Sequence, residues 1–112
     1  MIAGLPSSTD PRVEFVKGLF QDTLPGFLKS HPLEQPRKKV IHLDADLFTA
    51  TLYTLTTMAP ALNDGDILLF DEFNVPNHEF FAWKIFTESF YVKMEMLGAV
   101  NNYLQVAFKI VK

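Results

Sequence analysis

Four acidic side chains in this sequence lie where two predicted strands end, and acids in that position could act together. They are Asp44 and Asp46, which follow the apolar run 39–43, and Asp71 and Glu72, which follow the apolar run 66–70. The 27 residues from Asp44 to Asp71 are enough for one strand, one helix and two loops. If the two strands are neighbours in a parallel sheet, their ends lie ~5 Å apart and the carboxylates converge.

A cluster of carboxylates at one edge of a sheet has a defined chemistry. Like charges at short range raise each other's pKa unless a cation compensates them. Oxygen ligands in a chain without cysteine suit Mg²⁺ or Ca²⁺. A further carboxylate beside the cation could accept a proton from a substrate hydroxyl.

Structural roles stay open for each acid taken alone. Asp44 or Asp46 could cap the helix that begins near Leu47, and the later acidic pair could belong to a solvated loop. Acids at the ends of two strands, rather than one, favour the functional interpretation. His42 lies inside the first of these strands, so we interpret it as a hydrogen-bonded core or sub-surface residue rather than as a base.

Composition narrows the class of protein. The chain has 112 residues, which predicts one domain over 1–112, and its 48% hydrophobic content with 11 Phe is enough for a core. The absence of cysteine excludes disulfides and fits a cytoplasmic location. The net charge of -3 and the short basic cluster at 37–39 argue against nucleic acid as a partner. No apolar run approaches the ~20 residues of a membrane helix, so no membrane association is expected.

The elements that must position the acids alternate between strands and helices. Strands are predicted at 12–18, 39–43, 66–70, 92–97 and 103–112, and helices at 19–31, 47–62 and 75–90. The first helix is expected to break near Pro25 and Gly26, and residues 98–102 to connect the last two strands. The alternation predicts an α/β fold with a mostly parallel sheet, to which the final hairpin adds an antiparallel strand.

The apolar pattern also predicts which side chains are buried. The strand at 39–43 is expected to be covered on both faces, because it is apolar on both apart from His42. The helix at 47–62 is expected to bury one stripe and to leave Thr51 and Thr54 off it; the stripe consists of Leu47, Leu55, Met58 and Leu62. The aromatic side chains of the next helix are expected in the core; they are Phe80, Phe81, Trp83 and Phe86.

Three segments in this order resemble the macrocin O-methyltransferase family, over about residues 12–90. They are "VEFVKGLFQDTLPGFL", "VIHLDADLFTATLYTL" and "GDILLFDEF". The resemblance implies a class I Rossmann-like fold and an S-adenosylmethionine-dependent enzyme. It also implies site roles: Asp44 as a metal ligand, Asp46 as the catalytic general base, and Asp71 with Glu72 completing the metal site. Glu72 departs from the family, which often has a second aspartate there.

The resemblance further implies how much of the fold this chain represents. The family's sheet has the strand order 3-2-1-4-5-7-6, and the chain resembles its third to seventh strands. Its Gly-rich cofactor-binding part would lie before residue 1, so the residues here that bind S-adenosylmethionine are unknown. We therefore expect the C-terminal part of a metal-dependent O-methyltransferase that acts on a hydroxyl of a sugar or other small molecule. The isolated 112 residues are expected to be inactive.

The same strand order leaves the strand at 39–43 as an open edge and one sheet face bare. We therefore expect a homo-oligomer or association with the missing N-terminal segment.

Two other classes of protein stay open. A metal-dependent glycosyltransferase also uses Asp-x-Asp after a strand, but it would not explain the second acidic pair. Phosphatases of the haloacid dehalogenase type prefer Thr or Val where this chain has Phe48. A non-catalytic oligomerisation remnant is the third alternative.

Overall fold

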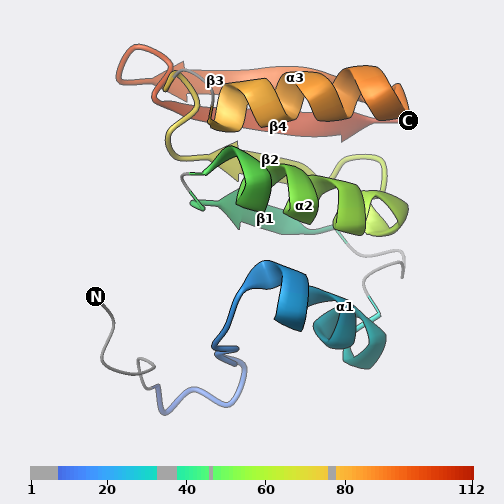
Figure 1. The fold of residues 1–112 in the computed structure, drawn as a ribbon. Helices are drawn as coiled ribbons and strands as arrows, with labels where there is room; N and C mark the ends of the chain where they lie inside the picture. Colours follow the sequence, from blue (N-terminus) through green and yellow to red (C-terminus); the bar gives the residue numbers. More distant parts are fainter. Residues whose placement is uncertain (1–7, 33–37, 46, 76–77) are drawn as a thin grey trace.

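The computed structural model describes residues 8–32, 38–45, 47–75 and 78–112. Figure 1 shows the elements in chain order. They are the helix α1 (Phe20–Ser30), the strand β1 (Val40–Leu43), the helix α2 (Phe48–Met58) with the short 3₁₀ helix η1 (Ala59–Ala61), the strand β2 (Ile67–Phe70), the helix α3 (Glu79–Phe90), and the strands β3 (Lys93–Val100) and β4 (Gln105–Val111). No helix in the described part of the chain is both long and apolar enough to cross a bilayer.

The four strands form one sheet in the order β1-β2-β4-β3. β1 and β2 are parallel, whereas β4 runs antiparallel to both β2 and β3. The predicted α/β architecture is confirmed, and the sheet is mixed, partly parallel and partly antiparallel. The order also agrees with the one expected for the fourth, fifth, seventh and sixth strands of the family.

The pairing of β1 with β2 sets the geometry of the sheet edge at which Asp44 and Asp71 follow the strands. Both are short apolar runs separated by one helix, so α2 acts as the crossover of a βαβ unit. Their register runs from Val40 opposite Ile67 to Leu43 opposite Phe70. The carboxyl ends of the two strands therefore lie at the same level of the sheet.

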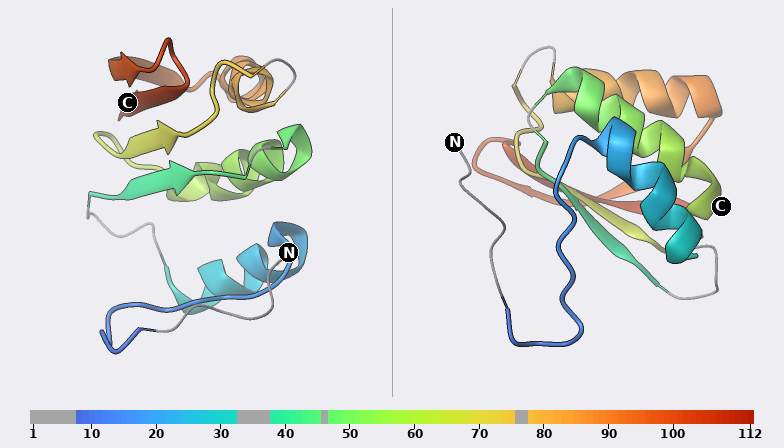
Figure 2. Two further views of the ribbon diagram at one scale, coloured as in Figure 1. Left: turned by 90° about the vertical axis from the view of Figure 1, so that its left-hand side faces the viewer. Right: turned by 60° about the horizontal axis from the view of Figure 1, so that its bottom comes forward.

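All three helices lie on one side of the sheet, which Figure 2 shows in its left-hand view. The core lies between the sheet and the helices α2 and α3, where Phe70 of β2 and Phe86 of α3 are fully buried. The opposite face is open, so β1 is not covered on both sides as expected: Val40 is 64% exposed and His42 is exposed as well. Because side chains alternate along a strand, the burial of Ile41 and Leu43 against the helices turns Val40 and His42 outward.

The segment 12–18 was expected to be a strand, and this prediction is wrong. It is an extended stretch outside the sheet, and its apolar side chains Val13, Phe15 and Val16 are exposed. A β-strand needs a partner backbone for its hydrogen bonds, and the described sheet offers none at that place.

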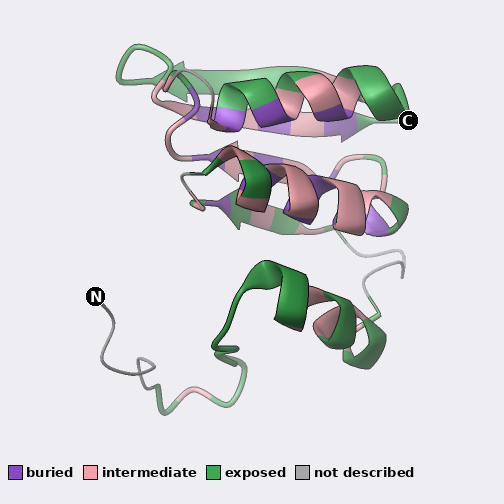
Figure 3. Ribbon diagram, in the orientation of Figure 1, coloured by how far each residue is buried: buried purple, intermediate pink, exposed green. Residues whose placement is uncertain are grey.

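The helix α1 continues through Pro25 and Gly26, where a break was expected. Proline removes one backbone donor from a helix, and the other bonds of α1 hold the remaining turns. α1 has no buried residue, and Figure 3 shows it as largely exposed.

The buried stripe of α2 differs from the expected one. Thr51 and Thr54 are buried beside Leu55 and Met58, whereas Leu47 is exposed. The four buried residues follow the i, i+3, i+4, i+7 spacing of a single helix face. The Thr54 hydroxyl donates to the backbone oxygen of Ala50 (2.8 Å), which allows this polar side chain to be buried.

The aromatic side chains of α3 are divided between core and surface. Phe86 is buried and Trp83 is half-buried, but Phe80 and Phe81 are exposed, against expectation. Consecutive positions point in different directions around a helix, so one face cannot bury all four rings.

The hairpin turn lies at 101–104 rather than at 98–102, and β3 extends to Val100 with a bulge between Met96 and Gly98. Asn101, Asn102 and Tyr103 all have positive φ, which turns the chain between the two strands.

A buried ion pair joins the amino ends of β1 and β2. Lys39 Nζ lies 2.7 Å from Asp66 Oδ2, and the Asp66 side chain is completely buried. Burial alone would raise the pKa of Asp66, but the Lys39 side chain, the backbone N–H groups of Asn63 and Lys39, and the Lys39 charge together lower it. Because its pKa is lowered on folding, Asp66 stabilises the fold above its unfolded pKa of ~3.9, and this contribution is lost as the pH falls.

We predict that Asp66→Asn lowers the free energy of unfolding by roughly 3–5 kcal/mol at pH 7, because it leaves the buried Lys39 charge without its counter-ion. The variant also lacks the contribution of Asp66 that the native chain loses below about pH 5. Its free energy of unfolding should therefore fall less between pH 7 and pH 4 than that of the native chain. Urea denaturation at pH 7 and at pH 4 measures both effects. The exposed pair of Lys84 and Glu88 (3.1 Å) provides the control, since Glu88→Gln should cost less than about 1 kcal/mol. Equal losses in the two variants would contradict the role given to Asp66.

Candidate functional site

The carboxyl ends of β1 and β2 bring Asp44 and Asp71 side by side. Leu43 and Phe70 are the last pair in the register, and each acid is the next residue in its chain. The Asp71 N–H donates to the Leu43 carbonyl oxygen (3.2 Å), which continues the ladder by one bond. The two acids are therefore about one interstrand spacing apart at the backbone, ~4.8 Å. This confirms the expectation that the two strands are neighbours.

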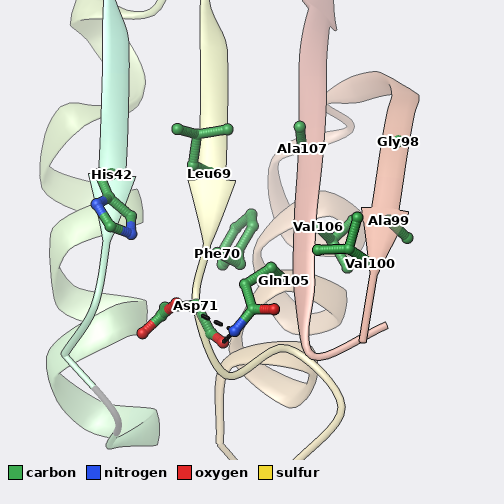
Figure 4. A pocket seen from close by; sticks show the side chains of 10 residues that line it. All are labelled: His42, Leu69, Phe70, Asp71, Gly98, Ala99, Val100, Gln105, Val106 and Ala107. Atoms are coloured by element: carbon green, nitrogen blue, oxygen red, sulfur yellow. Dashed lines mark hydrogen bonds between the residues drawn. The ribbon is translucent and has the colours of Figure 1, made fainter. Parts of the chain in front are cut away.

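The side chain of Asp71 is oriented from β4. Gln105 Nε2 lies 3.4 Å from both the backbone oxygen and Oδ1 of Asp71 and donates toward them. Figure 4 shows the Gln105 amide directed at Asp71 across the end of the sheet. Asp71 is half-buried, whereas Asp44 is exposed. A solvent-facing carboxylate therefore lies next to one that the sheet holds in place.

The backbone of Glu72 is held by the helix that follows it. Its N–H donates to Oε1 of Glu79 (3.0 Å), and Glu79 is 0% exposed in the first turn of α3. A carboxylate at the amino end of a helix is favoured by the helix dipole. Glu79 thus joins the start of α3 to the loop that carries the acidic pair.

The structure describes three of the four expected site residues. The structure brings Asp44 and Asp71 to one edge of the sheet, with Glu72 following directly. Asp46 lies outside the described residues. Within the described ranges, no group of three or more His, Asp or Glu side chains is arranged to hold a metal ion.

A pocket of about 400 Å³ lies on the open face of the sheet beside Asp71. Leu69 and Ala107 form part of its apolar lining, and His42, Asp71 and Gln105 supply polar groups (Figure 4). His42 was expected in the core or just below the surface, but it is exposed on this open face. The lining of the pocket thus combines the His42 imidazole of β1 with the Asp71 carboxylate that follows β2.

Two contacts at this edge were missed by sequence reasoning. Gln105 opens β4, and only the tertiary position of the hairpin brings it to Asp71. Glu79 had a local signal, because an acid in the first turn of a helix directly after an acidic loop is well placed to accept that loop's N–H groups.

A sequence model of one protein family matches most of the chain. The family is described as Macrocin-O-methyltransferase (TylF), and the match covers residues 7–105.

Two curated relatives match a shorter part. One is the 8-demethyl-8-(2,3-dimethoxy-alpha-L-rhamnosyl)-tetracenomycin-C 4'-O-methyltransferase of Streptomyces olivaceus, 35% identical over 59% of this chain and 23% of that enzyme. The other is the Mycinamicin III 3''-O-methyltransferase of Micromonospora griseorubida, 34% identical over 60% of this chain and 24% of that enzyme. The matched segment thus spans about a quarter of the length of each relative.

A solved structure shows the same fold. The chain is similar to the O-methyltransferase NovP with a TM-score of 0.72 and 24% sequence identity, over 93% of this chain and 40% of the NovP chain.

The contact between Glu79 and Glu72 predicts graded effects of substitution. Glu79→Gln keeps a side-chain oxygen that can accept a hydrogen bond from the Glu72 N–H. Glu79→Ala removes this acceptor and creates a cavity. We expect Glu79→Ala to lower the free energy of unfolding by roughly 1–3 kcal/mol, and Glu79→Gln by less. Hydrogen exchange of the Glu72 amide provides a local measurement: it should accelerate in the alanine variant and stay near the native rate in the glutamine variant. Equal exchange in all three proteins would show that Glu79 does not hold this loop.

Proposed function

Since this chain belongs to the macrocin O-methyltransferase family, we propose that it contributes the acceptor-activating part of an S-adenosylmethionine-dependent O-methyltransferase. The observation that carries this proposal is the adjacency of Asp44 and Asp71 at the ends of parallel neighbouring strands. In open α/β sheets, ligands bind outside the carboxyl ends of the strands. The acids therefore lie where an acceptor hydroxyl would be bound.

The methyl donor supplies a methyl group on a sulfonium, which is a good leaving group. The protein's own task is then to position the acceptor and remove its proton. The sequence has no Gly-rich turn of the kind that lets a backbone approach a cofactor, since its five glycines are scattered. No residue described here is assigned to the cofactor, and we propose that most of its contacts come from outside these residues.

We propose that Asp44 and Asp71 hold a divalent cation such as Mg²⁺, with Glu72 as a third ligand. The donor set fits a hard cation because it consists of carboxylate oxygens on two adjacent strands. A cation bound there would supply positive charge to orient an acceptor hydroxyl. Glu72 is one methylene longer than aspartate, and the Glu79 contact fixes its backbone.

Asp46 is proposed as the general base. It lies two residues after Asp44 in the chain. Its carboxylate would take the proton of the acceptor hydroxyl as that oxygen attacks the methyl carbon, so that the methyl ether and a protonated carboxyl are formed together.

The acceptor is proposed to be a hydroxyl of a sugar or other small molecule. One relative is named for a rhamnosyl-bearing tetracenomycin, and its name gives the 4'-oxygen as the methylation position. The other is named for the 3''-oxygen of mycinamicin III. The alternative of a metal-dependent glycosyltransferase receives no support from these relatives.

We predict that Mg²⁺ or Mn²⁺ binds this chain and that Asp44→Asn and Asp71→Asn weaken binding strongly. Mutation of a residue that only hydrogen-bonds a metal ligand typically lowers metal affinity roughly 10–100-fold. Loss of a ligand itself should lower the affinity by at least as much. Calorimetric titration of the purified chain measures this without any assay of activity. Glu72→Gln should have a smaller effect than either aspartate variant, and Glu88→Gln, far along α3, should have none. Equal affinity in the native chain and in both aspartate variants would contradict the proposed metal site.

We propose that a second copy of this chain covers the open face of the sheet and the outer edge of β1. The motivation is the combination of the exposed Val40, the unpaired outer edge of β1 within the described sheet, and the absence of any described helix on that face. Light scattering over a range of low concentrations should show dimers or larger species, and Val40→Lys should shift the equilibrium toward the monomer. A native chain that stays monomeric and folds cooperatively would contradict this proposal.

A further inference from the structure

A second pocket, beside the loop that follows Asp71, is lined almost entirely by large apolar side chains. Its volume is about 470 Å³, within the range of small-molecule sites. We call it the aromatic pocket; its lining residues are Phe73, Asn74, Val75, Phe80, Met96 and Tyr103. They come from the loop after β2, from α3, from β3 and from the hairpin turn, so four separate elements meet around it.

The inner side of the aromatic pocket is a packed group of rings. Phe73 is nearly buried, and its ring lies 5.3 Å from Phe80 at 89° and 5.6 Å from Trp83 at 73°. Trp83 in turn stacks on Phe108 of β4, with ring centres 5.0 Å apart at 19°. Such edge-to-face and stacked contacts hold rings in fixed orientations. The inner side of the pocket is therefore a preformed aromatic surface.

The outer walls of the pocket leave apolar surface in solvent. Phe80 is 44% exposed, Met96 46% and Tyr103 55%. These three large side chains come from different elements and line the same pocket. Unlike isolated apolar residues on a surface, they together offer a continuous apolar area to a ligand. Met96 adds a flexible, polarizable wall that can adapt to ligands of different shape.

The backbone of the pocket is tied to the acidic edge of the sheet. The Phe73 N–H donates to the Leu104 carbonyl oxygen (2.8 Å), and Asn74 Nδ2 donates to the Asn102 carbonyl oxygen (2.9 Å). These two bonds hold the hairpin turn against the loop that begins at Asp71. Only Glu72 lies between Asp71 and Phe73 in the chain, so the α-carbons of these two residues are at most about 7 Å apart.

The backbone conformation of Tyr103, which forms one outer wall of the aromatic pocket, is energetically unfavourable. Its φ of 67° lies in the left-handed region, which is unfavourable for a bulky side chain. Strained backbone of this kind persists where surrounding contacts fix it, and it clusters at ligand sites.

We propose that the aromatic pocket binds a flat apolar group of the acceptor, the aglycone of an aromatic glycoside, while the sugar hydroxyl lies at Asp44 and Asp71. This inference rests on the proposed function for the position of the sugar. A planar ring entering the pocket stacks on Phe80 and Tyr103 and displaces water from their exposed faces. A free sugar has no comparable group and gains nothing from this surface.

The test uses 2-naphthyl α-L-rhamnopyranoside as a fluorescent probe of the native 112-residue chain. Its fluorescence anisotropy is measured as protein is added, and methyl α-L-rhamnopyranoside serves as a competitor that lacks the ring system. We expect the naphthyl probe to bind. The methyl glycoside, measured by its competition with the probe, should bind at least roughly tenfold more weakly than the probe does.

Two variants remove the walls of the pocket and one provides a matched control. Tyr103→Asn removes the ring but keeps a residue type that tolerates positive φ, and Met96→Ala shortens the wall on β3. Leu97→Ala is the control, because Leu97 is next to Met96 and 48% exposed but does not line the pocket. We expect roughly threefold to tenfold weaker probe binding for each wall variant and no change for the control. Probe affinities that are the same in the wall variants and in Leu97→Ala would overturn the proposal.

The same titration separates this proposal from the proposed function. Asp71→Asn should weaken binding of the naphthyl glycoside but not of 2-naphthol, which has no sugar. If the wall variants weaken binding of both ligands while Asp71→Asn affects neither, the pocket is supported and the acceptor role of the acidic edge fails. If Asp71→Asn weakens glycoside binding while the wall variants do not, the acidic edge is supported and the pocket proposal fails. Binding that appears only at protein concentrations where the chain self-associates would place the probe between copies, and this too would overturn the pocket proposal.

Discussion

The parallel pairing of β1 with β2 is the constraint on which the rest of the structure depends. Each strand has only four residues, and their register is continued at both ends by single hydrogen bonds, from Ile67 to Lys39 and from Asp71 to Leu43. At the amino ends, the buried pair of Lys39 and Asp66 closes the βαβ unit. A slip of one residue would separate this pair and would also move the acids at the other end out of line. The interaction that stabilises one end of the unit thus also keeps Asp44 and Asp71 aligned at the other end.

The segment after β2 links three features that would otherwise be independent. Asp71 receives the Gln105 amide from β4, Glu72 is held by Glu79 of α3, and Phe73 forms the inner side of the aromatic pocket. The acids, the hairpin and the ring cluster are therefore connected through one loop. In the proposed arrangement, an aglycone in the aromatic pocket and a hydroxyl at the acids would contact the same loop, so their two positions would be coupled.

The strand order was implied by the resemblance to the family. The apolar runs of strand length, one helix apart, indicated a βαβ unit, and Asp44 and Asp71 were expected to be adjacent if its two strands are neighbours. Burial was harder to predict. Thr51 and Thr54 are buried because a helix face is selected by what packs on it, and a threonine hydroxyl can bond back to its own helix. His42 is exposed because the described helices cover one face of the sheet only. The contact of Gln105 with Asp71 spans the whole hairpin, and no local pattern encodes it.

The adjacency of Asp44 and Asp71 can be tested directly, since the chain has no native cysteine. The double variant Asp44→Cys with Asp71→Cys places two thiols on neighbouring strands, where the expected α-carbon separation of ~5 Å lies within the range that a disulfide spans. Under mild oxidation at low protein concentration, we expect a cross-link within one chain, detected by mass spectrometry after proteolysis. The pair Asp44→Cys with Asp64→Cys, whose second residue precedes β2 at the opposite end, should not form one. Failure of the first pair to cross-link within the chain, or equal cross-linking of the two pairs, would contradict the arrangement of the acids on which the proposed function rests.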